Sequence, residues 1–411
     1  MPSIAGSFSI SVGELLIDRI GGIVSTGTSG SYWQGKALPS VFKHELLRRY
    51  IPPFGGMTGT QSHDRRVVYL DGYAGEGRYE NGEPASAEIA LQVAEHHRAM
   101  GLNLSCFFVE QQPKSFQRLQ EVVNGYRARG VNAQAHRGEV DGVLDDVVRQ
   151  ARGVPLFLFL DPCGLCLPME RLVDVLARRR PERRPATELL MNFSMMAVWR
   201  LGGHVRSPKG NEKSLERFDA VCGGDWWREY FVDSTASEHN ATEAVAAEYA
   251  RRLKERTGMS VQSVPVAKAP HLKPVYHLVF ATRSPYGLWV FGDALARARD
   301  EWWKTLELRD GEQNPDTLFS TVEVWRPDPG ELEAAAVPAM AANLERVLQH
   351  ARRPVKLVDH TLELFGTYYG QVTDPVVRRA VKYLHRQGKT PTTGVGERRI
   401  RELIVHPETR S

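Results

Sequence analysis

A chain of 411 residues is long enough for two or three domains, and 42% apolar residues argue against wholesale disorder. Its longest apolar runs, such as Val154–Leu160, are far too short to span a bilayer, so we expect no membrane partner. The net charge of +4 does not by itself indicate a class of partner.

The cysteines and the N-terminus predict a cytoplasmic protein. Four cysteines are too few to hold a disulfide scaffold of this size. Cys163 and Cys166 form a single C-x-x-C without a second pair, so we expect no metal site. The first residues lack a basic segment ahead of an apolar one, which is not typical of a secretory signal. We therefore expect reduced thiols.

The first half of the chain alternates short apolar runs with amphipathic segments. Residues 1–60 are interpreted as an N-terminal extension with one helix, around "LPSVFKHELLRRYI". Beyond it, alternating β and α segments favour a right-handed, doubly wound parallel α/β sheet. Five parallel strands are predicted: Val67–Leu70, Leu104–Val109, Asn132–His136, Leu156–Leu160 and Glu188–Phe193.

This alternation ends after the fifth strand. Residues 194–257 contain no clear strand and are interpreted as a helical insertion, whose aromatic residues (Trp226, Trp227, Tyr230 and Phe231) are expected to form a small core of their own. Met259–Val264 and Val275–Ala281 then read as two further strands. Five parallel strands, a helical excursion and a terminal pair match the seven-stranded sheet of Rossmann-like methyltransferases, here placed at residues 61–325.

The rest of the chain predicts a small C-terminal module at residues 340–411, after a linker near 325–340. Three helix candidates and a final segment that could form a hairpin wing suggest a winged helix. Residues 351–411 carry 12 lysines and arginines against 6 acidic residues. This excess fits either a solvated basic surface or a nucleic-acid footprint.

The most informative stretch is "VVYLDGYAGEGRYENG", Val67 to Gly82. A buried strand leads into Gly75 and Gly77, which let the backbone turn tightly, and a helix is expected near Ser86 as its N-cap. Strand, glycine turn and helix form a nucleotide site at the carboxyl edge of an α/β sheet. The same pattern also occurs in glycine-rich turns that bind nothing.

Four acidic residues follow the first four strands and should meet at one edge of the sheet. They are Asp71, Glu110, Glu139 and Asp161. An acid after the second strand can accept hydrogen bonds from both ribose hydroxyls, each contributing roughly 1.5–3 kcal/mol.

A dinucleotide enzyme would also place an acid there. However, the G-x-G-x-x-G fingerprint needs a third glycine where this chain has Glu80, and Asp71 would repel a pyrophosphate. S-adenosylmethionine carries a positive sulfur and an ammonium, which suit Asp71 and Glu76. These residues therefore favour S-adenosylmethionine over NAD.

The ordered set of motifs resembles the three-Cys-motif partner (TcmP) family. D-G-Y-A-G-E-G-R-Y, V-E, L-D-P-C-G and L-M-N-F-S carry the resemblance, with "WQGKALPSVFKHELLRRYI" before them and "HLVFATRSPYGLWVFGDAL" after them. It covers roughly residues 33–300 and implies a Rossmann-like, methyltransferase-like protein with a protein partner that carries the three cysteines. The expected cofactor-binding residues are Asp71, Tyr73, Ala74, Gly75, Gly77, Glu110 and Glu139.

A more distant likeness is to ribosomal RNA adenine-N6 methyltransferases, which have a comparable Lys-His segment and a D-P-P-Y motif. In those enzymes the acid and a proline carbonyl hold the target amine, and the final aromatic stacks on the base. This chain has Asp161, Pro162, Cys163 and Gly164, and Gly164 cannot stack. A nucleobase acceptor would need another aromatic, and Phe193 and Tyr73 are the alternatives, unless both are core residues.

We therefore expect an S-adenosylmethionine-dependent methyltransferase that acts on an amine of a nucleic acid or a small molecule. The expected catalytic residues are Asp161, Pro162 and Asn192, and the expected substrate-binding residues are Lys43, His44, Tyr79 and Ser194. Lys43 and His44 could instead lie on a solvated helix face, and Asn192 and Ser194 could be satisfied strand-end residues. Two functional alternatives remain: a non-catalytic or degenerate member that binds nucleic acid or a partner protein, and a small-molecule methyltransferase with the insertion as its lid. The oligomeric state stays open.

Overall fold

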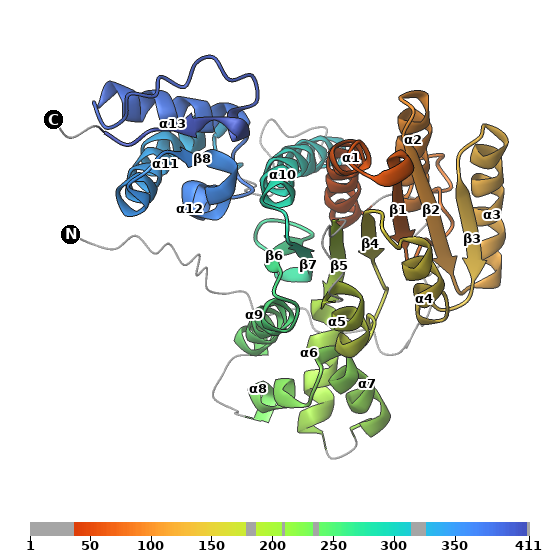
Figure 1. Ribbon diagram of the computed structural model, residues 1–411. Coiled ribbons are helices and arrows are strands. Elements are labelled where there is room, and N and C mark those ends of the chain that lie inside the picture. Colours follow the sequence, from red (N-terminus) through yellow and green to blue (C-terminus); the bar gives the residue numbers. More distant parts are fainter. Residues whose placement is uncertain (1–36, 178–185, 208–209, 233–237, 314–325, 409–411) are drawn as a thin grey trace.

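The computed structural model describes residues 37–177, 186–207, 210–232, 238–313 and 326–408. Its centre is a seven-stranded sheet with the order β3-β2-β1-β4-β5-β7-β6 (Figure 1). The strands are β1 Arg66–Asp71, β2 Asn103–Glu110, β3 Ala133–Arg137, β4 Leu156–Leu160, β5 Thr187–Ser194, β6 Ser260–Ala267 and β7 Pro274–Thr282. The first five strands are parallel and β7 is antiparallel to β5 and β6, which confirms the predicted methyltransferase-like sheet.

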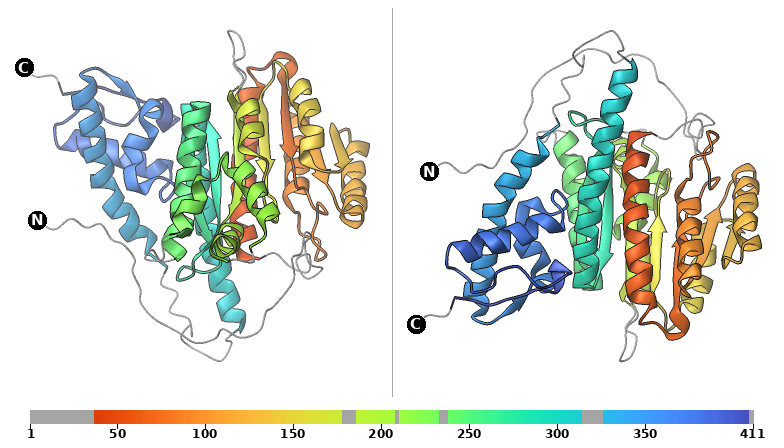
Figure 2. Two further views of the ribbon diagram at one scale, coloured as in Figure 1. Left: turned by 90° about the horizontal axis from the view of Figure 1, so that it is seen from below. Right: turned by 90° about the horizontal axis from the view of Figure 1, so that it is seen from above.

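Helices cover both faces of the sheet (Figure 2). The helices α1 Leu38–Gly59, α2 Ser86–Ala99, α3 Pro113–Ala128 and α10 Pro285–Gln313 lie on one face, and α1 and α10 pack side by side there. The helices α4 Val140–Gln150, α5 Met169–Ala177, α6 Met195–Arg206 and α9 Glu238–Thr257 lie on the other face. Successive residues of a strand point to opposite faces of the sheet and pack into the hydrophobic core on each face. Tyr69 and Phe157 therefore face α1, whereas Val68 and Leu158 face away from it.

Helix α1 was expected within an N-terminal extension, yet it is one of the helices that cover this face of the sheet and is part of the α/β domain. Leu46, Leu47 and Ile51 on this helix are completely buried against the sheet and α10. Residues 1–36 lie outside the described part of the chain.

The insertion after β5 is helical, as predicted, and comprises α6, α7 Glu212–Cys222, α8 Glu229–Val232 and α9. The expectation of a separate aromatic core was wrong. Trp227 and Phe231 are buried, but they belong to the same cluster as Leu189 and Phe193 of the sheet. The reason is that α6 packs against β7 and α9 packs against β6 and β7, so the insertion extends the main core.

The C-terminal module contains α11 Pro329–Ala351, α12 Thr361–Phe365 and α13 Asp374–Arg386, with the short strands β8 Val355–Lys356 and β9 Ile404–Val405. The expected hairpin is not formed, because β9 pairs with β8 and the segment after α13 is largely irregular. Helix α11 also begins inside the segment interpreted as a linker, where the Asp328 carboxylate accepts the backbone N–H groups of Gly330 and Glu331. Short 3₁₀ turns occupy His63–Arg65, Trp226–Arg228, Leu357–His360, Gly366–Tyr368 and Ile400–Glu402.

Helix α10 joins this module to the sheet. Trp289 on α10 is buried in the module's own core, and its Nε1 donates to the Asp374 carboxylate at 2.7 Å. The Tyr369 hydroxyl donates to the Leu288 carbonyl at 2.6 Å, and its ring packs where Gly292 has no side chain. The module is therefore fixed on α10 by polar and apolar contacts. In the described ranges, no helix has both the length and the apolar character needed to cross a membrane.

Candidate active site

The register of the sheet brings the predicted acidic residues to one edge and one face. Asp71 ends β1 and pairs with Phe159 of β4, so Asp161, two residues beyond Phe159, points to the same side. Leu190 pairs with Phe159 in turn, which places Asn192 on that side as well. This is the face covered by α1. Two of the predicted catalytic residues, Asp161 and Asn192, thus meet beneath the N-terminal half of α1.

A buried ion pair links α1 to this edge. The Lys43 ammonium binds the Asp161 carboxylate, and Asn192 Nδ2 donates to the other carboxylate oxygen, Oδ1, at 2.9 Å. Burial on its own would lower the pKa of Lys43, but the charges of Asp161, Tyr276 and Tyr79 outweigh it and the net pKa is raised. Lys43 and His44 are only 3% exposed, so the alternative of a solvated helix face is wrong.

Three buried polar atoms near this pair have no hydrogen-bond partner among the described residues. They are Asp71 Oδ2, Asn192 Oδ1 and Tyr69 Oη. A buried polar group without a partner costs free energy, so such atoms in a native site call for an explanation. All three lie on the face of the sheet that carries Asp161, and a polar ligand in the site would satisfy them.

Asp71 sits at the base of the glycine turn. It is fully buried, and the Tyr73 amide donates to its Oδ1 at 3.1 Å. Burial raises the pKa of Asp71 to about 7, with Asp161 adding to the rise and Ser86, the Tyr73 amide and Lys43 opposing it. A cation placed here would favour the ionised carboxylate. Ser86 is the first residue of α2 instead of its N-cap, which is Ala85, and its hydroxyl faces Asp71.

The glycine turn takes the tight conformation predicted for it. Gly75 and Gly77 have φ angles of 62° and 79°, in the left-handed region that favours glycine. A Cβ on Gly77 would lie 3.2 Å from Leu119 of α3, so this glycine also allows close packing of the turn against a helix. Ala74 is buried and its amide donates to the Val109 carbonyl at 2.9 Å, which ties the turn to β2.

Glu76 does not have the role suggested for it. Its carboxylate is bound by Arg118 at 2.5 Å and by the Ser115 hydroxyl at 3.4 Å, both on α3. The side chain is therefore already paired with a cation and tied to α3. Of the two acids expected to attract a positively charged cofactor, Asp71 alone has an oxygen that no described residue hydrogen-bonds.

Glu110 lies beside the glycine turn, as a ribose-binding residue would. Burial raises the pKa of its carboxyl, and the amides of Gln112, Gly75 and Gln111 partly oppose the rise. Glu139 is exposed at the start of α4 and accepts a hydrogen bond from Gln111 Nε2 at 3.2 Å. Tyr73 is half-buried and packs against the core on the far face of the sheet. The structure thus places Glu110 beside the turn, whereas Glu139 and Tyr73, which were also expected to bind the cofactor, lie at the margin of the site.

Aromatic rings surround the Lys43–Asp161 pair. The rings of His44 and Tyr79 are 5.9 Å apart, and Lys43 Nζ is 5.9 Å from the ring of Tyr276, whose hydroxyl donates to the Pro39 carbonyl at 2.5 Å. Sequence reasoning missed Tyr276. It lies within the regular alternation of a strand, and only its pairing with Ser194 across β5 and β7 places it at the site.

Other expected residues have structural roles. The Ser194 hydroxyl accepts the Ala197 amide at 3.2 Å and caps α6, which is the satisfied strand-end alternative. Phe193 stacks on Tyr249 with ring centroids 4.5 Å apart, on the face of the sheet away from Asp161, so it cannot stack on an acceptor there. Cys163 is exposed and Cys166 half-buried, and burial raises the pKa of the Cys166 thiol to about 12. Pro162 lies directly after Asp161 and is buried.

Comparisons with known proteins give loose structural similarities. No family model matches the chain, and no curated protein matches it in sequence. Among solved structures, the chain is similar to a precorrin-6y C5,15-methyltransferase from Geobacter metallireducens (15% identity, 56% of this chain and 86% of that one, TM-score 0.26). It is also similar to an rRNA methylase from Streptococcus thermophilus (12% identity, 57% and 96%, TM-score 0.27). A third is Trm1 from Pyrococcus horikoshii with S-adenosyl-L-methionine (11% identity, 62% and 57%, TM-score 0.34). The fold assignment itself rests on the strand order of the sheet.

Proposed function

We propose that this chain is an S-adenosylmethionine-dependent methyltransferase of the TcmP type that transfers the methyl group to an amine. The observation that carries the proposal is the site beneath α1. There a buried acid under a glycine turn and an asparagine held by Asp161 each present an oxygen without a partner among the described residues. One oxygen suits a cationic cofactor and the other suits an N–H donor.

The chain offers a consistent set of residues for the cofactor. The glycine turn at Gly75 and Gly77 would hold its methionine part beside Asp71, and Glu110 would accept the ribose hydroxyls. Ala74 ties the glycine turn to β2, and Tyr73 and Glu139 lie at the margin of the site. When bound, S-adenosylmethionine supplies a methyl group on a positively charged sulfur. Asp71 Oδ2, which accepts no hydrogen bond from the described part of the chain, is the reason for preferring this cation to the anionic pyrophosphate of NAD.

The hydrogen bonds of Asp161 indicate which atoms would bind the methyl acceptor. Because Lys43 binds one carboxylate oxygen and Asn192 binds the other, Asp161 is not an open ligand for an amine. Its bond to Asn192 Nδ2 turns the amide so that Oδ1 faces the site. We propose that Asn192 Oδ1 and the Pro162 carbonyl accept the N–H groups of the acceptor.

An amine acceptor would become positively charged as its nitrogen bonds to the methyl carbon, while the carbon–sulfur bond breaks and S-adenosylhomocysteine leaves, and the amine would then release a proton to water. The carboxylate of Asp161, one side chain away, stabilises that charge more in the transition state than in the ground state. Lys43 opposes this effect, but it also fixes Asp161 in place. The protein's main contribution is alignment of the acceptor with the methyl group.

The acceptor is proposed to be an amine of a nucleic acid or of a small molecule, and Tyr79 or Tyr276 would supply the aromatic contact that Gly164 lacks. Lys43 and His44 complete this side of the site from α1. The Lys43–Asp161 pair also favours a second candidate, a non-catalytic protein that binds the cofactor, because the pair already neutralises the acid at this position.

Transfer of labelled methyl from S-adenosylmethionine distinguishes the two candidates. The full chain is incubated with single-stranded RNA, single-stranded DNA and a panel of small amines, and incorporated label is counted. Label on one acceptor class, reduced in Asn192→Leu, supports the enzyme. Cofactor binding without transfer to any class, in the wild type and in Lys43→Met, supports the non-catalytic candidate.

A further inference from the structure

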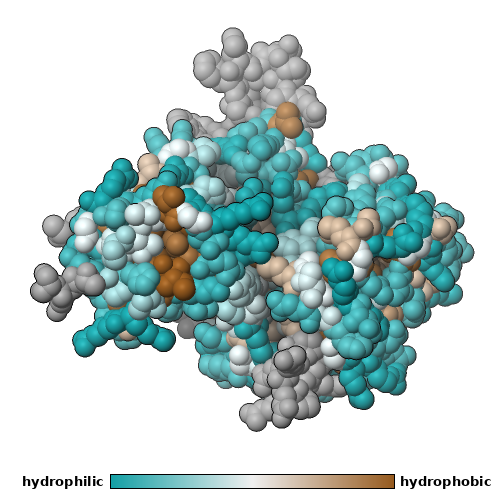
Figure 3. Space-filling model, turned by 45° about the horizontal axis from the view of Figure 1, so that its top comes forward, coloured by the Kyte–Doolittle hydropathy of each residue, from teal (hydrophilic) through white to brown (hydrophobic). Residues whose placement is uncertain are grey.

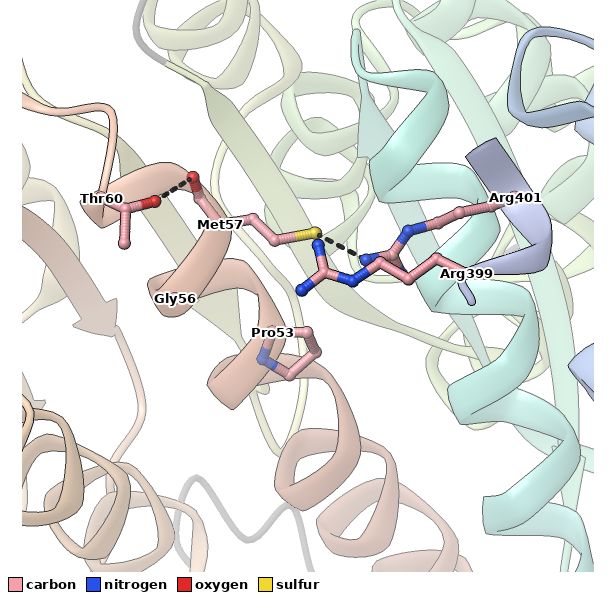
Figure 4. Close-up of a pocket in the computed structure, with 6 residues that line it drawn as sticks. All are labelled: Pro53, Gly56, Met57, Thr60, Arg399 and Arg401. Carbon is pink, nitrogen blue, oxygen red and sulfur yellow. Dashed lines mark hydrogen bonds between the residues drawn. The ribbon is translucent and has the colours of Figure 1, made fainter. Parts of the chain in front are cut away.

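A hollow lies at the other end of α1, between this helix and the C-terminal module (Figure 4). Its volume is about 390 Å³, and Pro53, Gly56, Met57 and Thr60 of the α1 end line it together with Arg399 and Arg401. Lys43 and Met57 are 14 residues apart on α1, about 21 Å at 1.5 Å per residue. The hollow is therefore separate from the methyl-transfer site.

Two guanidinium groups meet in this hollow (Figure 4), and none of the described residues that line it is a carboxylate. Arg399 is exposed, and its side chain has no partner among the described residues. Arg401 Nη2 donates to the thioether sulfur of Met57 at 3.5 Å, which is a weak acceptor, and its Nε is buried without a hydrogen bond within the described ranges. Glu402 Oε1 is 3.7 Å from that Nε, a long ion pair, and the other oxygen of the same carboxylate, Oε2, is bound by Lys356 and the Tyr286 hydroxyl.

The segment that carries these arginines is held firmly. Arg378 on α13 donates to the carbonyl oxygens of Gly394 and Glu397, both at 2.7 Å. Ile400 lies between the two arginines and is buried in the core of the module. Anchored on both sides, the segment presents Arg399 and Arg401 toward α1 together, which lowers the entropic cost of binding an anion.

The charge around the hollow indicates what kind of anion it takes. Arg398, next to Arg399 in the chain, is exposed, as are Lys382 and Arg386 on α13, the helix to which Arg378 ties this segment, and none of the three side chains forms an ion pair with a described residue. Most of the surface in the view of Figure 3 is hydrophilic. A single small anion needs only the two arginines, whereas a chain of phosphates would also use this wider set of cations.

We propose that the hollow between α1 and the C-terminal module binds a backbone phosphate of a nucleic-acid strand, with Arg399 and Arg401 as the paired donors. Guanidinium groups bind phosphate through two parallel N–H···O bonds, which is why arginine predominates at such sites. This binding does not depend on methyl transfer. The structural alternative is that the two cations only offset the partial negative charge at the carboxyl end of α1.

The test uses the full chain and fluorescence anisotropy with labelled 20-nucleotide RNA and DNA strands at several salt concentrations. Arg399→Ala should weaken binding at least fivefold and reduce the slope of log affinity against log salt by about one. Arg127→Ala is the matched control, since Arg127 is an exposed cation on α3 at the far end of the sheet, and it should change neither quantity (Figure 1).

A second variant tests the hollow without removing a charge from the module. A Cβ on Gly56 would meet no atom within 4 Å, so a side chain fits there. Gly56→Glu should place a carboxylate beside the arginines and abolish the strand's contact, while Gly56→Gln, of the same size, should retain most of it. Equal affinities for all variants, or no binding at low salt, would overturn the proposal. A third result would also overturn it: inorganic phosphate raises the melting temperature of the protein, while Arg399→Ala binds the nucleic-acid strand as well as the wild type does. That result would assign the hollow to a free anion.

Discussion

Lys43 on the helix before β1 forms an ion pair with Asp161 at the end of β4, 118 residues later in the chain. Their side chains are 4% and 15% exposed, so the pair is largely withdrawn from water. It holds α1 over the carboxyl edge of the sheet, so that this helix covers the candidate site. The stability of the fold and the geometry of the site are therefore coupled through one contact.

Breaking this pair from one side should be costly. Lys43→Met leaves a buried carboxylate without its cation, and we expect a loss of roughly 3–5 kcal/mol in the free energy of unfolding, measured by urea denaturation at pH 7.5. The double variant Lys43→Met/Asp161→Asn removes both charges and should recover more than half of that loss. A double variant that is no more stable than the single one would show that Lys43 acts through packing alone.

The orientation of Asn192 should matter for turnover. Asp161→Ala removes the acceptor that turns the amide, and we expect at least a tenfold loss of turnover, about 1.4 kcal/mol of transition-state stabilisation, with cofactor affinity nearly unchanged. Single-turnover transfer of labelled methyl measures the effect. Asn211→Ala, which removes only the N-cap of α7, is the control for general loss of stability. Full activity in Asp161→Ala would remove this residue from the mechanism.

The sequence predicted the sheet well because strands and glycine turns are local signals. The ends of β1, β2 and β4 determined which acids reach the carboxyl edge, and Glu110 and the turn at Gly75 do lie together. The sequence patterns did not predict the contacts between segments that lie far apart in the chain. The surroundings of Lys43 depend on how α1 packs, and the pairing of Glu76 with Arg118 depends on the position of α3. The role of Tyr276 likewise follows from strand order, which composition and periodicity do not specify.

Asp71 should make ligand binding depend on pH. Burial raises the pKa of its carboxyl to about 7, so below that pH much of it is neutral. If the ammonium of S-adenosylhomocysteine lies beside it, binding favours the ionised form and releases a proton. Affinity should therefore rise from pH 6 to pH 8, and calorimetry in buffers of different ionisation enthalpy should detect the proton. Asp71→Asn should bind more weakly and show a flat pH profile. A flat profile in the wild type would place the ammonium elsewhere.

Glu188 should give the fold itself a pH dependence. This residue of β5 is buried between the sheet and α1, where the hydroxyls of Tyr50 and Thr282 donate to its carboxyl. Burial raises the pKa of that carboxyl to about 7. The folded chain then holds a proton that the unfolded chain releases above its ordinary pKa of about 4.3, so this group's contribution to stability falls as pH rises toward 7 and levels off above it.

Glu188→Gln removes this titration and keeps an acceptor for Thr282. We expect its free energy of unfolding to change less than that of the wild type between pH 5 and pH 8. Glu121→Gln, on the exposed surface of α3, should follow the wild-type profile. Parallel profiles for Glu188→Gln and the wild type would mean that Glu188 titrates alike in the folded and unfolded chains.

The central claim is that the glycine turn and Glu110 form a site for S-adenosylmethionine. Titration calorimetry of the full chain with S-adenosylhomocysteine tests it most directly, with NAD as the competing ligand and Glu110→Ala as the variant. We expect one site for S-adenosylhomocysteine, no binding of NAD, and affinity at least tenfold weaker in Glu110→Ala, a loss of about 1.5–3 kcal/mol. Binding of NAD in place of S-adenosylhomocysteine, or of neither ligand, would contradict it.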